Sequence, residues 1–179
     1  MLYTLNTDYL YMLIIHLIGK VGSGKTYFYE KFLAAYPRFD IKSIYEKLNI
    51  QSNELTDPRL HAEFNTTLVN DLWATIKNAT LQQSPVVVIE SSGMNTMLNA
   101  SILHIKQLDL YIIWVDCAIN DRIYQERPYA ERINKVFQSK IVNSNIMFHT
   151  KFDWDVKFFT VTPPDHVLAL NPELKKCIL

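Results

Sequence analysis

The sequence lacks a net charge and contains little cysteine. Its 179 residues include 18 Lys and Arg against 18 Asp and Glu. General nucleic-acid binders usually carry a basic excess, so this balance argues against that class. It leaves room for a short basic groove that takes one nucleotide or a nucleic-acid 5′ end. The cysteines, Cys117 and Cys177, have no metal or redox spacing, which favours a reducing, cytoplasmic compartment with Cys117 as a small core residue.

Long apolar runs are missing as well. A membrane-spanning helix needs about 18 to 20 apolar residues, whereas the stretch 9–18 is shorter and includes His16. The N-terminus also lacks the positive charge and cleavage site of a secretory signal. The sequence therefore predicts no membrane partner. Without repeats or low-complexity segments, residues 12–179 are expected to form one domain, preceded by an extension at 1–11.

One glycine-rich stretch organises the rest of the chain. The apolar run 13–18 ends at Gly19, and residues 19–26 satisfy the pattern G-x-x-x-x-G-K-[ST] of the phosphate-binding loop. Glycines let backbone N–H groups converge on an anion, and the helix that follows adds its positive dipole end. Lys25 is expected to reach the outer phosphates and Thr26 to contact Mg²⁺. The expected ATP-binding residues are Gly19, Gly22, Ser23, Gly24, Lys25 and Thr26.

Apolar strands alternate with amphipathic helices along the chain. Strands are expected at 13–18, 39–41, 86–90, 110–115 and 156–161, and helices at 25–35, 44–48, 59–82, 94–106, 119–126, 131–151 and 172–177. This alternation predicts parallel βαβ units with helices on both faces of one sheet, an α/β fold in three layers. Ligands in such sheets bind beyond the carboxyl ends of the strands. The chemistry is therefore expected at that edge.

Two carboxylates fall at expected strand ends. Glu90 follows four apolar residues and is a candidate Mg²⁺ ligand, acting directly or through water, or a base. The alternative is an acid that interacts with a helix dipole or lies in a turn. Asp40 lies on the acceptor side of the loop and is a candidate general base. Its alternative is an N-cap of the helix that follows. The sequence leaves both alternatives open.

Two arginines near a proline are candidates for a catalytic lid, and three other side chains are expected in the core. Arg122 and Arg127 lie in a segment interrupted by Pro128, and arginines from a mobile segment can stabilise charge on a transferring phosphoryl group. Arg132 is expected to lie on a solvated face. Buried positions are expected for His16, as a hydrogen-bonded core histidine, and for Trp73 and Trp114.

The order of these parts resembles the small P-loop kinases, the group of nucleoside-monophosphate kinases, shikimate kinases and polynucleotide kinases. The resemblance runs from residue 12 to about 164 and rests on GKVGSGKT at 19–26, RFDIKSIY at 38–45, VVVIESSG at 86–93 and YIIWVDCAINDRIYQER at 111–127. It implies a five-stranded parallel sheet in the order 2-3-1-4-5, ATP and Mg²⁺, an acceptor site near Asp40 and a small helical lid at about 119–140. Glu90-Ser-Ser-Gly stands where many nucleotide kinases carry Asp-Gly-aromatic-Pro.

The leading hypothesis is thus an ATP-dependent phosphotransferase with a small hydroxyl or phosphate acceptor. Its expected catalytic residues are Lys25, Asp40, Glu90, Arg122 and Arg127, and its expected Mg²⁺ ligands are Thr26 and Glu90. The alternative is a nucleotide-binding switch or regulatory ATPase or GTPase that acts through a protein partner. The guanine-reading N-K-x-D sequence is absent, since the only Asn-Lys pair continues as Val-Phe.

Overall fold

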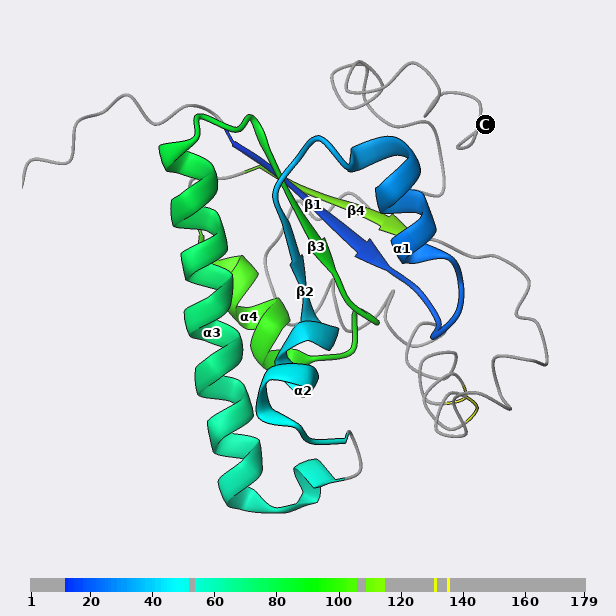
Figure 1. The fold of residues 1–179 in the computed structure, drawn as a ribbon, viewed down its shortest axis with the longest axis vertical. Helices are drawn as coiled ribbons and strands as arrows, with labels where there is room; N and C mark the ends of the chain where they lie inside the picture. The colour runs from blue at the N-terminus through cyan, green and yellow to red at the C-terminus, as the bar shows by residue number, and fades with distance from the viewer. Residues whose placement is uncertain (1–11, 52–53, 106–108, 115–130, 132–134, 136–179) are drawn as a thin grey trace, which may run out of the picture.

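The computed structural model describes residues 12–51, 54–105, 109–114, 131 and 135 (Figure 1). Its elements are, in order, β1 (Leu13–Ile18), α1 (Lys25–Phe28), a π-helical turn η1 (Tyr29–Leu33), β2 (Arg38–Asp40), α2 (Ile41–Leu48), a 3₁₀ turn η2 (Glu54–Thr56), α3 (Pro58–Leu81), β3 (Val86–Glu90), α4 (Thr96–His104) and β4 (Asp109–Trp114). Strands and helices alternate along the chain as the sequence predicts.

The strands form one sheet in the order β2-β3-β1-β4, and every pairing is parallel. This arrangement agrees with the first four positions of the order implied by the sequence resemblance. The strand expected at 156–161 lies outside the described residues, so the five-strand order stays a prediction. All six residues of β1 are buried, because this central strand is flanked by β3 and β4 and covered on both faces.

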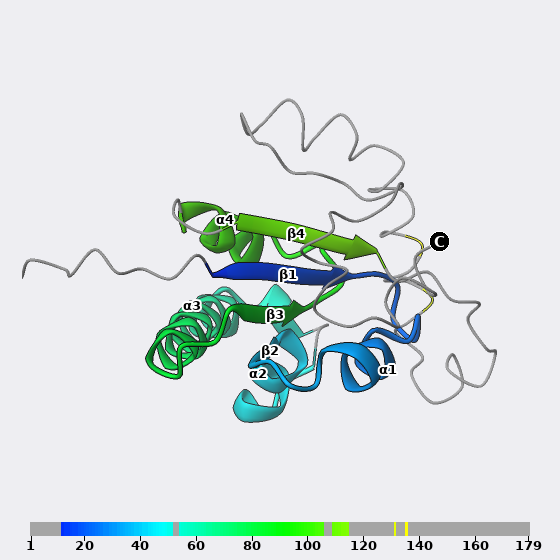
Figure 2. The ribbon, with the colours of Figure 1, turned by 90° about the horizontal axis from the view of Figure 1, so that it is seen from above.

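Each face of the sheet packs against its own set of helices, with α1 on one side of the strands and α2, α3 and α4 on the other (Figure 1). Figure 2 shows the four strands side by side. One apolar cluster joins β1, β2 and β3 to α2, α3 and α4; its buried members are Met12, Ile14, Phe39, Ile44, Phe64, Leu68, Leu72, Ile76, Ala79, Val87, Ile89, Leu98 and Ile102. The other joins β1 and β3 to η1; its buried members are Leu13, Ile15, Leu17, Phe32, Leu33, Val86 and Val88. Alternate residues of β1 and β3 thus serve opposite layers, as the period of a strand requires.

Helix α3 is the longest element, with 24 residues. Its start follows from local sequence: the Asp57 side chain accepts from Arg59 N at 2.8 Å, and Pro58 occupies the first turn, where its missing N–H costs nothing. The prediction that Trp73 belongs to the core is wrong, because its side chain is 45% exposed. Leu72 occupies the buried stripe, and Trp73 is turned away from it by about 100°, one residue's rotation along a helix.

The first helix also differs from the expectation of one regular helix over 25–35. Four α-helical residues pass into the π-helical turn η1, which ends at Leu33. The next strand follows only four residues later, after Pro37, and a helix rarely continues into the residue before a proline. This widened turn carries Tyr29, which enters the site described below.

Several expected segments lie outside the described residues: the extension at 1–11, the tail helix, and most of the lid at 119–140. Within that lid range, Lys135 and Glu131 form an exposed ion pair of 2.7 Å. The backbone of Trp114 is described as the end of β4, while Cys117 falls in the part of the chain that the structure does not describe. None of the helices in the described ranges combines the length and apolarity that a membrane crossing requires.

Candidate functional site

The glycine-rich loop connects the carboxyl end of β1 to α1. Gly22 and Gly24 have φ angles of 83° and 87°, in the left-handed region that side chains other than glycine rarely adopt. Gly24 is the residue directly before α1, and its carbonyl accepts from Phe28 N at 2.8 Å, which closes the first helical turn. The Ser23 N–H in turn donates to Lys20 O at 3.2 Å. The sequence pattern therefore predicts the loop and the glycine at position 24, whereas Gly22 lies at a position that the pattern leaves free.

Lys25 folds back over this loop. Its ammonium group donates to the carbonyl oxygens of Gly19 at 3.0 Å and Lys20 at 2.7 Å. Both acceptors belong to the loop itself, so the positive charge lies beside the backbone that is expected to surround the phosphates. A lysine ammonium has three donors and can exchange such neutral acceptors for phosphate oxygens, which form stronger, charge-assisted bonds.

Ser23 lies at the base of the loop. Its side chain is fully buried, and its hydroxyl has no hydrogen-bond partner in the described structure. A buried hydroxyl without a partner is costly and uncommon in folded proteins. The loop thus retains an unused polar group next to the residues that are expected to bind ATP.

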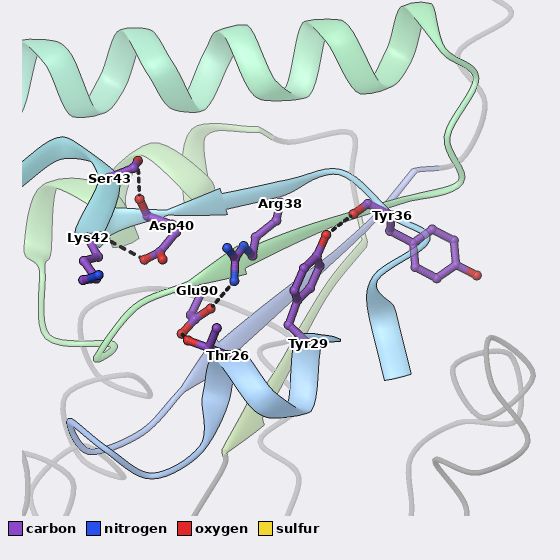
Figure 3. Close-up of polar contacts among 8 residues, drawn as sticks. All are labelled: Thr26, Tyr29, Tyr36, Arg38, Asp40, Lys42, Ser43 and Glu90. Carbon is purple, nitrogen blue, oxygen red and sulfur yellow. Dashed lines mark hydrogen bonds and ion pairs between the residues drawn. The ribbon is translucent and has the colours of Figure 1, made fainter. Parts of the chain in front are cut away.

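Glu90 is the centre of the polar contacts in Figure 3. It ends β3 and is buried, with 5% of its surface exposed. Thr26 Oγ1 donates to Oε1 of Glu90 at 2.7 Å, and Arg38 Nη1 donates to Oε2 at 3.2 Å. Each carboxylate oxygen therefore has its own donor, one from α1 and one from β2. The hydroxyl and carboxylate expected to bind Mg²⁺ are in direct contact.

The charge state of Glu90 reflects opposing influences. Burial raises the pKa of the Glu90 carboxyl, and the neighbouring negative charge of Asp40 acts in the same direction. The Thr26 hydrogen bond and the positive charges of Arg38 and Lys25 lower it, but burial dominates, so the pKa lies above its ordinary value. The donors thus oppose the effect of burial on the Glu90 carboxyl without cancelling it.

Asp40 lies beside Glu90 because the two are register partners in the parallel pair β2–β3. Adjacent strands are about 4.8 Å apart, and partners in register share one face of the sheet. Oδ1 of Asp40 accepts from Lys42 N at 2.9 Å, and its carbonyl accepts from Ser43 Oγ at 2.6 Å. Asp40 is therefore the N-cap of α2, one of the two roles that the sequence leaves open.

Arg38 is the site residue that sequence analysis missed. Its Cζ lies 4.5 Å from the centroid of the Tyr29 ring, and its guanidinium contacts Glu90. The Tyr29 hydroxyl donates to Tyr36 O at 2.8 Å, which fixes the ring. The sequence offers no clear signal for this role, because the strand expected at 39–41 begins one residue after Arg38.

A second buried pair joins the ends of β1 and β3 on the opposite face. His16 Nε2 and Ser91 Oγ are 2.7 Å apart, and Gly93 N donates to the same oxygen at 2.9 Å. Burial lowers the pKa of His16 to about 3, so the imidazole is neutral near neutral pH. The expectation of a hydrogen-bonded core histidine agrees with these contacts. The pair fixes the turn directly after Glu90.

The structure thus brings together the loop, Lys25, Thr26, Asp40 and Glu90. Arg122, Arg127 and Arg132 lie outside the described residues, so the lid arginines stay predictions. Their positions in the sequence follow the backbone of β4, which pairs with β1 on the side opposite β3.

Comparisons with known proteins give a likeness of fold. No family model and no curated protein matches the chain. Among solved structures it is similar to a chain of a Pnkp1/Rnl/Hen1 complex, at 17% identity and a TM-score of 0.49, with 68% of this chain and 41% of that chain covered. It therefore spans less than half of that chain.

Two shikimate kinases are similar over most of both chains. The enzyme from Bacteroides thetaiotaomicron has 16% identity and a TM-score of 0.47, with 93% of this chain and 98% of that chain covered. The enzyme from Aquifex aeolicus vf5 has 14% identity and a TM-score of 0.38, with 88% and 92% covered.

Proposed function

We propose that this chain is an ATP-dependent phosphotransferase that acts on a small hydroxyl or phosphate acceptor. The observation that carries the proposal is one edge of the sheet where the loop with Lys25 lies close to the neighbouring carboxylates Glu90 and Asp40. Binding a polyphosphate requires only the loop with Lys25. A second carboxylate beside Glu90 supports transfer to another molecule.

The loop and Lys25 are proposed to bind the phosphates of ATP. Lys25 would leave the carbonyl oxygens of Gly19 and Lys20 for the β- and γ-phosphates, since charged acceptors form the stronger bonds. The buried Ser23 hydroxyl supports a ligand at this loop, because a polar ligand would supply the partner that the protein does not.

Thr26 and Glu90 are proposed to hold Mg²⁺. Their oxygens are 2.7 Å apart, and a hydroxyl with one carboxylate is a suitable donor set for an ion that keeps most of its waters and shares the substrate phosphates. When bound, Mg²⁺ would neutralise charge on the β- and γ-phosphates. Glu90 has a second donor in Arg38, which would continue to hold its carboxylate if Thr26 bound the metal.

Asp40 is proposed to accept the proton of the acceptor hydroxyl. The N-cap contact uses Oδ1, so Oδ2 can take the proton. The acceptor oxygen forms a bond to the γ-phosphorus, the bond from that phosphorus to the bridging oxygen breaks, and ADP leaves with the electron pair. Arg127 and Arg122 are proposed to neutralise the charge on the transferring group from the lid at 119–140.

Transfer of label from γ-labelled ATP tests the proposal, with a panel of nucleosides, nucleotides, small hydroxy acids and oligonucleotides with 5′-hydroxyl ends. We expect Mg²⁺-dependent transfer to one class, lost in Lys25→Ala. Slow hydrolysis that no acceptor accelerates would overturn the proposal. Strict GTP selectivity in that case would favour the alternative of a regulatory switch.

A further inference from the structure

A closed chain of contacts joins Thr26, Glu90, Arg38 and Tyr29. Thr26 contacts Glu90, Glu90 contacts Arg38, and Arg38 lies against the ring of Tyr29. Tyr29 follows Thr26 by three residues in one continuous helical segment, which closes the ring of contacts. Three separate segments are therefore joined at one carboxylate (Figure 3).

The two donors of Glu90 are not equivalent. Thr26 is exposed and carries a rotatable hydroxyl, whereas Arg38 is braced on the face of Tyr29, which is itself held by Tyr36 O. A planar guanidinium stacked on an aromatic ring has few ways to move. The Arg38 contact is thus the fixed one, and the Thr26 contact is the one that can exchange.

We propose that Arg38 is a positioning residue, which holds one oxygen of Glu90 and so directs the other to the Thr26 hydroxyl. This inference rests on the proposed function only for its catalytic consequence. The carboxylate is pre-oriented before any ligand arrives, which avoids an ordering cost at the moment of reaction. Asp40, the neighbouring negative charge, makes this fixation necessary, because repulsion would otherwise turn Glu90 away.

The proposal that Arg38 orients Glu90 is tested without ATP, by chemical denaturation of the full chain. A double-mutant cycle of Thr26→Val and Glu90→Met gives the coupling free energy between these two residues. The same cycle is then measured in a chain that also carries Arg38→Met. We expect Arg38→Met to remove at least half of the Thr26–Glu90 coupling. A purely structural role for Arg38 would lower stability and leave that coupling unchanged, which would overturn the proposal.

Three further variants keep the test decisive if Arg38→Met does not fold. Arg38→Lys retains the charge without the planar fork, and we expect an intermediate coupling. Tyr29→Phe keeps the ring face but loses the bond to Tyr36 O, so it should retain more of the coupling than Tyr29→Leu, which removes the ring. The matched control is Arg59→Met, an exposed arginine on the first turn of α3, which should leave the coupling as it is.

The catalytic part is tested by separating kcat from KM. Because a small misplacement of a catalytic group can cost up to about 100-fold, we expect Arg38→Met to lower kcat at least about tenfold and to leave the KM for ATP within about twofold. Arg38→Lys should recover part of the loss. A changed coupling with unchanged kcat would overturn the positioning role. If the unsubstituted chain transfers no phosphate, the proposed function fails, while the coupling measurement still decides whether Arg38 orients Glu90.

Discussion

The hydroxyl of Thr26 donates to Oε1 of Glu90 at 2.7 Å, joining residues that are 64 positions apart in the sequence. This contact ties the helix after the glycine loop to the end of β3. It also brings together the hydroxyl and the carboxylate that are proposed to hold Mg²⁺. The charges of Lys25, Arg38 and Asp40 all act on the Glu90 carboxyl at this contact.

Thr26→Val is expected to separate the contribution of this contact to stability from its proposed role in binding magnesium. Valine has nearly the shape of threonine but no hydroxyl, so Glu90 loses one donor and the unfolding free energy should fall by about 1 kcal/mol. Magnesium should then no longer strengthen ATP binding in calorimetric titrations. Thr26→Ser keeps the hydroxyl and serves as the control. Equal magnesium dependence in the valine variant and the unsubstituted chain would show that Thr26 is not a ligand.

Lys25→Met should weaken ATP binding while leaving the fold intact. The ammonium group contributes charge-assisted bonds to phosphate, each worth about 1.5–3 kcal/mol, so the Kd should rise roughly 10- to 100-fold. Isothermal titration with ATP measures the change. Lys47→Met is the matched control, since Lys47 forms an exposed pair with Asp71 between α2 and α3. A Kd unaffected by the loss of Lys25 would contradict nucleotide binding at this loop.

His16 is expected to make stability depend on pH. Its pKa of about 3 lies below the unfolded value of 6.5, so the unfolded state binds more protons between these values. The contribution of His16 to the unfolding free energy is complete above about pH 6.5. It decreases as the pH falls and is smaller by about 2 kcal/mol at pH 5. Denaturation curves at pH 7 and pH 5 measure it.

His16→Gln provides the comparison, because a glutamine amide can reach Ser91 but does not titrate. The difference in unfolding free energy between the variant and the unsubstituted chain should shrink on acidification. Ser91→Ala, by contrast, should lower stability at both pH values and keep most of the pH dependence. A constant difference between His16→Gln and the unsubstituted chain would mean that the imidazole is not buried in its neutral form.

Sequence analysis predicts those parts of the site that follow from short, local patterns. The loop is one such case, since the spacing of Gly22, Gly24 and Lys25 fixes backbone geometry within a few residues. Glu90 is another, because a continuous apolar run marks a buried parallel strand and its carboxyl end is where ligands bind. In both cases a short stretch of sequence is enough to predict where the residue lies in the fold.

The features that sequence analysis missed depend on packing between segments. Strand β2 has three residues, too few for alternation to show which face Arg38 occupies. Its role depends on Glu90, which is 52 residues away, and on the turn that presents Tyr29. Trp73 was misplaced for a related reason: α3 is rich in apolar residues, and only its packing against the sheet decides which of them form the buried stripe.

Asp40→Asn is expected to separate helix capping from catalysis. Asparagine caps helices about as well as aspartate, and its side-chain oxygen can accept from Lys42 N as Oδ1 of Asp40 does. The unfolding free energy should therefore stay within about 0.5 kcal/mol of the original, whereas Asp40→Ala should lose about 1 kcal/mol. An amide cannot take a proton, so kcat for phosphoryl transfer should fall about 100- to 10,000-fold in Asp40→Asn. Denaturation and single-turnover transfer, measured on the same preparations, give both quantities. If Asp40→Asn retained full turnover while Asp40→Ala lost only stability, Asp40 would be a helix cap alone, and the base would have to be sought elsewhere at this edge of the sheet.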